Sequence, residues 1–257
     1  MAERLSLEGL VLASGETELV HGIDLAVERG EVAALVGNSG GGKSLSLLAW
    51  LDLLPPGVRR LAGTIRLDGT VLEGPGLAGL RGGVVGLVPQ SPTSCLNPLV
   101  TIGRHFCETL ACSGRAARAE AAGRLAEVGF ATPERLLGLY PCQLSGGMLQ
   151  RVVIALALCR DPDFLFADEA TTDLDLESQA QVLVLLERLR DRRGIGILLV
   201  THDLAVVARL ADTASVLQHG RIVERRPVAD LFASPRAAAT RALLAAHHAL
   251  YEGGTAA

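Results

Sequence analysis

Short apolar runs alternate with helix-compatible segments along most of this chain. The runs carry valine, isoleucine, leucine and alanine with little polar alternation, which is typical of strands buried on both faces of a parallel sheet. Three runs are followed within two residues by polar side chains, and the fourth leads into a glycine-rich loop. We therefore predict an α/β fold with strands at residues 31–36, 84–88, 164–167 and 195–200.

Several segments between and after these strands have helical patterns. Pro55 should stop the first helix, and Gly194 should close the helix that precedes it. Ser145 is a natural N-cap, and residues 221–224 read as an edge strand. The predicted helices cover residues 45–54, 101–113, 115–128, 145–160, 174–193 and 236–250.

The glycine-rich loop after the first strand has a complete phosphate-binding pattern. Lys43 is the only lysine among 24 basic residues, and its compact ammonium differs chemically from a guanidinium fork. Backbone N–H groups and a helix N-terminus would face a phosphate chain, with Lys43 on the β- and γ-phosphates and the Ser44 hydroxyl on Mg²⁺. A plain glycine turn would not need Lys and Ser in these places. The loop reads Gly37-Asn38-Ser39-Gly40-Gly41-Gly42-Lys43-Ser44, followed by Leu45.

Polar residues at the ends of the other strands suggest the rest of an active site. Parallel sheets bind ligands beyond the carboxyl ends of their strands, so Gln90, Asp168, Glu169 and His202 should gather with Lys43. Asp168 suits the hydration sphere of Mg²⁺, and Glu169 could polarise the attacking water. Gln90 could sense metal and water, while His202 could contact the γ-phosphate or orient Glu169. Taken singly, the acidic pair could equally be a helix N-cap and the histidine structural.

Composition narrows the class of protein. The net charge is −4 and 49% of residues are hydrophobic, which argues against a nucleic-acid-binding role and against disorder. No apolar run approaches 20 residues and the N-terminus lacks a signal-peptide core, so we expect a soluble cytoplasmic chain. Five cysteines without a C-x-x-C pair indicate no disulfide framework.

A second glycine pair opens the helix that begins near residue 145. It provides another surface on which backbone N–H groups could read phosphate, which a single self-sufficient ATPase domain does not need. Together with Lys43 and Glu169, this motif resembles the ATP-binding subunits of ABC transporters. The signature residues are Leu144, Ser145, Gly146, Gly147 and Met148.

The resemblance covers essentially the whole chain and implies a P-loop NTPase with a RecA-like parallel core, an N-terminal antiparallel β subdomain and an inserted helical subdomain. It implies one ABC ATPase domain with a core at 1–90 and 161–235, a helical subdomain at 91–160 and a C-terminal helix and tail at 236–257. It implies ATP and Mg²⁺ as cofactors, Glu169 as catalytic base, Gln90 in a Q-loop, a D-loop at Asp175 and His202 as a switch.

The same resemblance implies partners. Two ATPase subunits would face each other head to tail, the second being a related but different chain. Two transmembrane permease subunits and, indirectly, an extracytoplasmic substrate-binding protein would complete an importer. The chain would then be peripheral on the cytoplasmic face of the inner membrane, with no nucleic-acid partner.

Local stretches narrow the resemblance to importers of dipeptides, oligopeptides and nickel, and within them to the D-type ATPases of nickel importers. These stretches are residues 90–103, 144–151, 171–175 and 246–251. An importer of peptides or of opine-type metal chelates would use the same machinery and stays open. A twin-cassette ATPase of translation or repair, or a P-loop kinase or GTPase, fits less well, since the chain has one cassette and a second phosphate-reading motif.

Two groups of possible metal ligands have poor spacing. His105, Cys107 and Cys112 form one group, and His247 with His248 forms the other. Neither matches a preformed metal site, so we interpret them as structural or surface residues.

Overall fold

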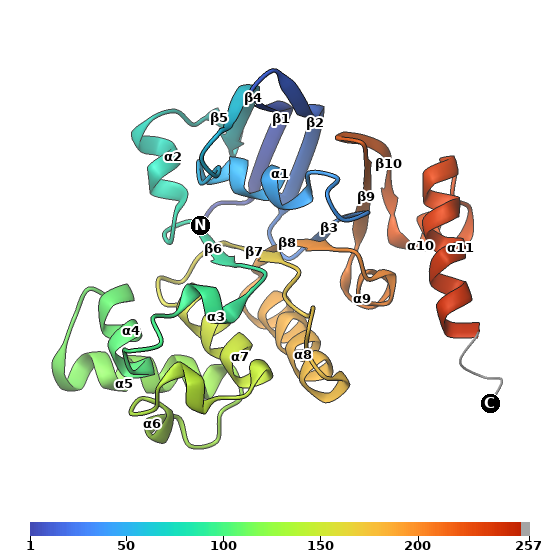
Figure 1. Cartoon of the computed structure of the whole chain (residues 1–257). Helices are drawn as coiled ribbons and strands as arrows, with labels where there is room; N and C mark the ends of the chain where they lie inside the picture. Colours follow the sequence, from blue (N-terminus) through green and yellow to red (C-terminus); the bar gives the residue numbers. More distant parts are fainter. Residues whose placement is uncertain (253–257) are drawn as a thin grey trace. The chain divides into compact units, whose positions relative to one another are not determined.

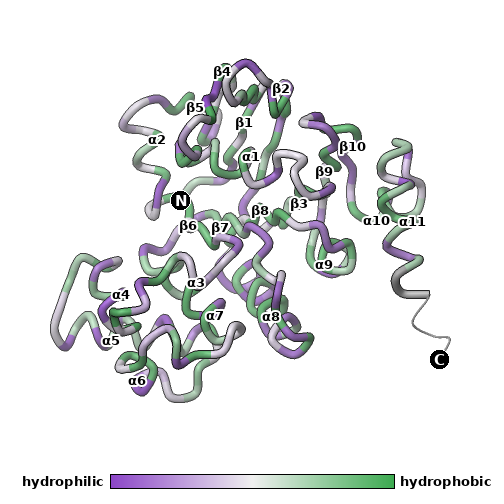
Figure 2. The backbone as a smooth tube through the Cα atoms, viewed as in Figure 1, coloured by the Kyte–Doolittle hydropathy of each residue, from purple (hydrophilic) through white to green (hydrophobic). Residues whose placement is uncertain are grey.

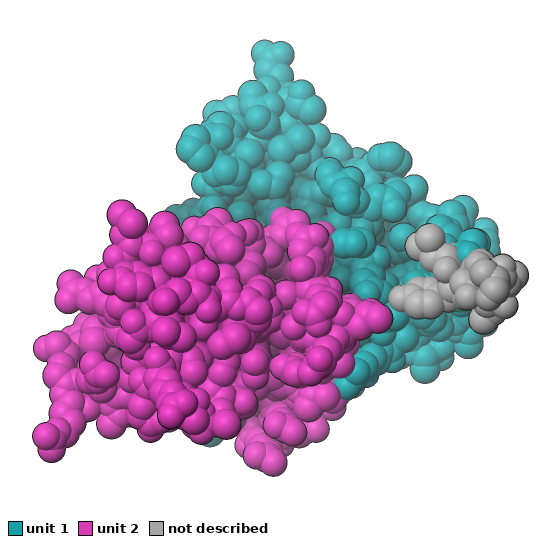
Figure 3. All heavy atoms as spheres, turned by 60° about the horizontal axis from the view of Figure 1, so that its bottom comes forward, with its two compact units in different colours: residues 1–78, 196–257 teal, residues 79–195 magenta. Residues whose placement is uncertain are grey.

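The computed structural model describes residues 1–252, with side chains described through residue 249. The chain divides into two compact units, coloured separately in Figure 3. Unit 1 comprises residues 1–78 and the chain from residue 196 onward, and unit 2 comprises residues 79–195. Part of the predicted tail, residues 253–257, lies outside the described residues.

Unit 1 contains an antiparallel sheet near the N-terminus, as the family resemblance implied (Figure 1). Its strand order is β2-β1-β4-β5, and every neighbouring pair is antiparallel. The pairing of β1 with β2 shifts register between Leu7 and Leu10. Gly9 lies in this shift with φ +63°, a conformation that other residues rarely adopt. The strands are β1 (Arg4–Ser14), β2 (Thr17–Glu28), β4 (Val58–Leu67) and β5 (Thr70–Val71).

A second group of strands in unit 1 has the order β10-β9-β3-β8. β3 is parallel to both β8 and β9, which confirms the predicted parallel pairing, and β10 adds antiparallel to β9. All residues of β3 and β8 are buried, and most of them are hydrophobic, as the green stretches near these labels in Figure 2 show. The strands are β3 (Val32–Gly37), β8 (Gly196–Thr201), β9 (Thr213–Gln218) and β10 (Arg221–Pro227).

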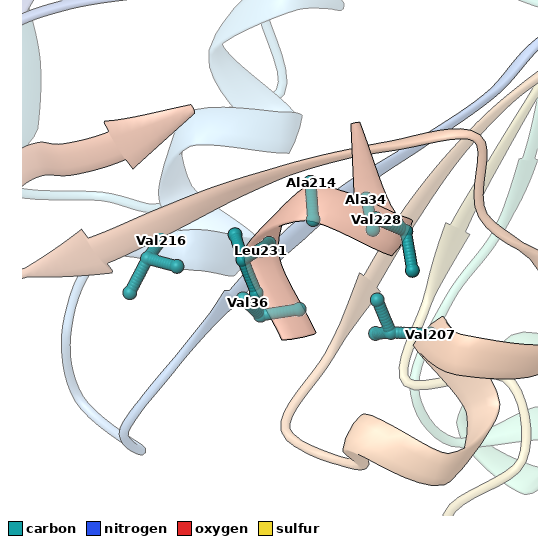
Figure 4. Close-up of a cluster of buried hydrophobic side chains, with 7 residues drawn as sticks. All are labelled: Ala34, Val36, Val207, Ala214, Val216, Val228 and Leu231. Carbon is teal, nitrogen blue, oxygen red and sulfur yellow. The ribbon is translucent and has the colours of Figure 1, made fainter. Parts of the chain in front are cut away.

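Helices of unit 1 cover these strands. A cluster of small aliphatic side chains joins β3 and β9 to two of the helices, as Figure 4 shows. Within it Val36 of β3, Val207 and Leu231 are fully buried. The helices are α1 (Lys43–Trp50), α9 (Leu204–Leu210), α10 (Val228–Ala233) and α11 (Ala238–Glu252), while α2 (Pro75–Leu80) lies where the division between units falls.

The carboxylate of Glu224 fixes the start of α11. Only 7% of this residue is exposed, and its carboxylate oxygens accept backbone hydrogen bonds from Arg236 and Ala237 at 2.9–3.1 Å. These bonds lower the pKa of Glu224, although burial opposes them. The C-terminal helix is thereby attached to the edge strand β10 by a charged side chain as well as by apolar packing.

Unit 2 is mainly helical and contains one parallel strand pair, β6 (Val85–Val88) with β7 (Phe164–Asp168). Every residue of β7 is buried. None of the helices within the described residues is both long and apolar enough to cross a membrane. The helices are α3 (Pro92–Cys95), α4 (Ile102–Thr109), α5 (Gly114–Glu127), α6 (Pro133–Leu136), the 3₁₀ helix η1 (Pro141–Gln143), α7 (Gly146–Ala157) and α8 (Leu176–Arg193).

Ion pairs link α5 and the end of α8 to the turn that precedes β7. Arg124 of α5 donates two parallel hydrogen bonds to the carboxylate of Asp161, at 2.7 and 2.8 Å. Arg193, at the end of α8, donates to the same carboxylate at 3.0 Å and also pairs with Glu127. The hydrogen bonds from Arg124 hold the pKa of Asp161 below its ordinary value of 3.8, although burial opposes them.

We predict that Asp161→Asn lowers the free energy of unfolding at pH 7 by roughly 0.5–1 kcal/mol, a modest value because the carboxylate is largely exposed to water. Since the folded-state pKa is depressed, the contribution is fully present above the unfolded-state pKa and is lost as pH falls through the folded-state value. Chemical denaturation of both proteins between pH 7 and pH 2.5 should therefore show the difference disappearing below about pH 4.

Asp52→Asn is the matched control, because Asp52 is exposed and has φ +53°, which asparagine tolerates. Its effect should stay small at every pH. A difference for Asp161→Asn that persists unchanged at pH 2.5 would contradict an ionic contribution.

Candidate active site

The glycine-rich loop connects the end of β3 to the start of α1, as predicted. Lys43 is the first residue of α1 and is 5% exposed. Its Nζ donates to the carbonyl oxygens of Gly37 at 2.9 Å and Asn38 at 3.1 Å. The ammonium is therefore held over the loop by the loop's own backbone.

The glycine-rich loop packs so closely against the rest of unit 1 that residues larger than glycine do not fit at two of its positions. A Cβ on Gly42 would lie 2.9 Å from Cγ2 of Val20, and the φ of Gly42 is +95°. A Cβ on Gly37 would overlap the carbonyl oxygen of Leu217. Both glycines are therefore required by space as well as by backbone conformation.

A cavity of about 460 Å³ opens beside this loop within unit 1. Residues 38–41 form one wall, and the other walls come from β2 and from residues 217–220, which are the end of β9 and the turn that follows it. A cavity of this size can hold a nucleoside-sized ligand. The sequence interpretation missed His21 and His219 in this wall, because nothing in their neighbourhood marks them and only the pairing of distant strands brings them to the loop.

His202 follows β8 at the same edge of the sheet as the glycine-rich loop. Val36 of β3 pairs with Thr201 of β8, so both strands end side by side. His202 is exposed, and the next residue, Asp203, caps α9 by accepting hydrogen bonds from Ala205 and Val206 at 2.8 and 3.4 Å. The structure thus places the loop and His202 at one edge within unit 1.

Unit 2 contains the carboxylates and the glutamine. Asp168 ends β7 and Glu169 follows it, with 7% and 9% exposure. Gln90 lies two residues beyond β6, and its Nε2 donates to Oε2 of Glu169 at 3.2 Å. The predicted meeting of Gln90 with Glu169 is confirmed. Thr172 also donates to this oxygen, at 3.3 Å, a contact that the sequence interpretation missed.

Glu169 has an unusual backbone conformation. Its φ is +48°, in the left-handed region that is costly for a residue with a long side chain. The backbone N–H of Thr172 donates to the carbonyl oxygen of Glu169 at 3.0 Å and closes the turn. Strain at a buried carboxylate held by two side-chain donors is typical of a functional position.

The signature residues lie at the start of α7, as predicted. The hydroxyl of Ser145 accepts a hydrogen bond from the backbone of Met148 at 3.3 Å, which confirms it as the N-cap. Gly147 is buried against α8, where an added Cβ would overlap the side chain of Ser178. Leu144 is 9% exposed, whereas Ser145 and Gly146 are exposed.

Asp175 caps the N-terminus of α8. Its carboxylate accepts from the backbone N–H and the hydroxyl of Ser178 at 2.8 and 2.7 Å, and these bonds lower its pKa. Ser178 therefore connects the segment at Asp175 with the signature helix. Sequence inspection did not single out this serine.

The structure accordingly presents the predicted residues as two sets. Unit 1 holds the loop 37–45 and His202, and unit 2 holds Gln90, Asp168, Glu169, Asp175 and the signature residues 144–148. Glycines too tightly placed for a Cβ fit a phosphate-binding loop, and hydroxyl and carboxylate oxygens are the donors that Mg²⁺ prefers. The catalytic and metal-binding roles of these residues remain predictions.

The two discounted groups of histidines and cysteines can be described where the structure covers them. His105 in α4 shares a hydrogen bond with the carbonyl oxygen of Asn97 at 3.2 Å. The rings of His247 and His248 are 6.0 Å apart. Among the residues with described side chains, no cluster of three or more metal-ligating side chains was found, and the five cysteines are free thiols.

Comparison with known proteins shows the class to which this fold and these motifs belong. Residues 20–172 match the ABC transporter family. The chain belongs to this family, and the predicted P-loop NTPase fold is confirmed by solved structures of its members.

Two relatives that are nickel import ATP-binding proteins match nearly the full length of the chain. The chain is 52% identical over 253 residues to the nickel import ATP-binding protein NikD of Rhodospirillum rubrum, which covers 96% of each chain. It is 49% identical over 249 residues to the NikD protein of Pseudomonas putida, again covering 96% of each.

Two solved structures have the same fold. One is CbiO1 of Clostridium perfringens, part of the ABC transporter complex CbiONQ, with a TM-score of 0.78, 26% identity and coverage of 91% of this chain and 92% of that one. The other is the dimeric ATP-binding cassette MJ0796 bound to ADP and Pi, with a TM-score of 0.75, 27% identity and coverage of 87% and 98%.

The close packing at Gly147 gives a testable consequence. We predict that Gly147→Ala lowers the free energy of unfolding by about 1–3 kcal/mol, because the new Cβ forces α7 away from Ser178. Combining it with Ser178→Gly should recover part of this loss, since the overlapping atoms are removed. Chemical denaturation of the two single variants and the double variant measures the coupling.

Gly146→Ala is the matched control, because a Cβ there would come no closer than 3.7 Å to Leu174. It should cost much less than Gly147→Ala. Strictly additive effects of Gly147→Ala and Ser178→Gly would contradict the predicted overlap.

Proposed function

We propose that this chain is the ATP-hydrolysing subunit that powers a nickel importer. The observation that carries the ATPase role is the buried carboxylate of Glu169 directly after β7, next to Asp168 and within hydrogen-bond distance of Gln90. A carboxylate held by donors at a strand end is suited to orienting and polarising a water molecule.

The two sets of residues would have different roles in phosphoryl transfer. The backbone of loop 37–45 and the ammonium of Lys43 would bind the phosphates of ATP, and His202 would contact the γ-phosphate. Ser44, Gln90 and Asp168 would hold Mg²⁺, which when bound neutralises charge on the phosphates. Glu169 would accept the proton of the attacking water. Reaction at phosphorus needs mainly positioning and charge stabilisation, which this set supplies.

The signature motif supports association with a second ATPase subunit. Ser145 and Gly146 are exposed at the N-terminus of α7, where backbone N–H groups and the helix dipole favour phosphate. We infer that residues 144–148 contact ATP bound to a facing subunit, and that Asp175 lies in the same interface. The dimeric state of the similar cassette MJ0796 supports this arrangement.

In the importer, the facing ATPase would be a related but different chain. Two permease subunits would span the membrane, with this chain peripheral on its cytoplasmic face and a binding protein delivering substrate from outside. The residues after Gln90, particularly 91–104, would receive a permease helix, because they connect a residue that touches the catalytic carboxylate to α4. Exposure of Leu99, at 85%, is consistent with such a contact.

Nickel as cargo rests on the nearly full-length similarity to NikD proteins. The ATPase subunit does not need to touch the transported substrate, so its own side chains carry no information about the cargo. The similarity to NikD proteins is therefore what supports nickel as the cargo of the transport system proposed for this chain.

Glu169→Gln tests the catalytic assignment. The amide keeps the size of the side chain and can still bond to Gln90, but it cannot take a proton from water. We predict that hydrolysis falls by roughly 10²–10⁴-fold while ATP remains bound. Steady-state phosphate release and retention of labelled ATP on the purified complex measure the two effects.

Glu134→Gln is the control, because Glu134 is exposed on α6 and makes no ion pair among the described residues. It should leave hydrolysis unchanged. Hydrolysis by Glu169→Gln at the wild-type rate would refute the role of Glu169.

Cargo is tested by uptake of radioactive nickel in cells with and without the chain, with labelled dipeptide measured in parallel. We predict that nickel uptake alone is lost, that the wild-type chain restores it, and that Glu169→Gln does not. Loss of dipeptide or metal-chelate uptake with normal nickel uptake would reject nickel and leave the ATPase role intact.

A further inference from the structure

A second cavity, of about 500 Å³, lies within unit 2 and shares no residue with the sites described above. It is bounded by α7, by one face of α8 and by the turn that follows α5. α7 and α8 lie side by side in Figure 1 and contact each other. Its volume falls within the range of small-molecule sites.

Arg151 of α7 contributes the most unusual group in this cavity. Its guanidinium stacks on the ring of Phe130, with the central carbon 4.3 Å from the ring centroid. Its Nε is buried and has no hydrogen-bond partner, and no carboxylate of the described residues pairs with the guanidinium. Burial lowers the pKa of Arg151, because a charged guanidinium is less well solvated there than in water. Because no carboxylate of the described residues compensates this charge, an anion in the cavity would meet an unpaired guanidinium.

The rest of the wall combines positive charge with apolar surface. Arg188 of α8 also lines the cavity and forms no ion pair within the described part of the chain. The carboxylate of Glu177 is bonded to Nε2 of Gln181 at 3.2 Å. Ala180 and Val184 supply apolar surface, whereas Val128 is only 2% exposed.

We propose that this cavity is a binding site for a small organic anion with an apolar body. The carboxylate or phosphate of such a ligand would accept from Arg151 and Arg188, whose forked donors match these groups. Its apolar part would cover Ala180 and Val184 and displace water from them. The charge of the wall, two arginines against one glutamate, excludes a cation as the preferred ligand.

The site is adjacent to the machinery assigned above through its two helices. Arg151 lies one turn beyond Gly147 on α7, and Glu177 precedes Ser178 on α8. A ligand in the cavity would therefore touch the same two helices that pack together at Gly147. The binding proposal itself does not depend on the proposed ATPase role.

The test is titration of the full chain, without nucleotide, with 1-naphthoate, which combines a carboxylate with a flat apolar body. Its neutral analogue 1-naphthylmethanol and acetate are titrated in parallel, and ligand fluorescence or calorimetry measures binding. We expect a dissociation constant of about 1 mM or tighter for 1-naphthoate. 1-Naphthylmethanol lacks the carboxylate and acetate lacks the apolar body, so each should bind at least roughly tenfold more weakly than 1-naphthoate.

Arg151→Gln should weaken binding of 1-naphthoate by roughly tenfold or more, whereas Arg118→Gln should not change it. Arg118 is an exposed residue of α5 that does not line the cavity. Both substitutions remove one positive charge, but only Arg151→Gln removes it from the cavity wall. Val184→Glu provides a second variant should Arg151→Gln fail to fold, since a negative charge in the wall must repel the ligand. Equal binding of the acid and the alcohol, or equal binding by all folded variants, would overturn the proposal.

Discussion

Placing an ionisable side chain close to the end of a buried strand is the constraint on which this structure depends. β3 and β7 are buried along their whole length; β7 ends in Asp168 with Glu169 next to it, and the glycine-rich loop joins β3 to Lys43. The chain solves this with local hydrogen bonds: carbonyl oxygens of the loop hold the ammonium of Lys43, and Gln90 and Thr172 hold the carboxylate of Glu169. Each group is thus held in place by the protein itself, and such preorganisation suits the roles proposed for Lys43 and Glu169.

In the helical part of unit 2, the position of the signature residues depends on close packing between α7 and α8. Gly147 lets α7 approach Ser178, and Ser178 in turn bonds to Asp175. Signature residues and the segment at Asp175 are therefore connected by one contact. At the opposite end of α8, Arg193 and Arg124 both donate hydrogen bonds to the carboxylate of Asp161, so specific contacts hold both ends of the helix. Displacing α8 would disturb the two motifs together.

The buried strands of the parallel pairs and the longer helices could be predicted from local patterns, whereas β1, β2, β4 and β9 had no predicted residue ranges. The four apolar runs became strands β3, β6, β7 and β8 to within a residue or two, and α8 ends at Gly194, which has the left-handed conformation of a C-cap. Among the predicted elements, the errors lie at helix ends. The helices expected to reach residues 54, 113 and 160 end at Trp50, Thr109 and Ala157, and a residue with positive φ follows each end within four positions, namely Asp52, Ala111 and Asp161. Residues other than glycine adopt this conformation uncommonly, so the sequence alone does not mark these ends.

What the sequence by itself determined is a set of local patterns: a glycine-rich loop with Lys43 and Ser44, a carboxylate pair after a buried strand and a capped glycine-rich helix start. Only the tertiary structure decided which groups meet. The bond between Gln90 and Glu169 joins residues 79 positions apart, and the cavity beside the loop brings β2 to residues 217–220. The unpaired Arg151 likewise became visible only when α7 packed beside α8. Contacts of this range follow from strand pairing and helix packing, which short sequence patterns do not encode.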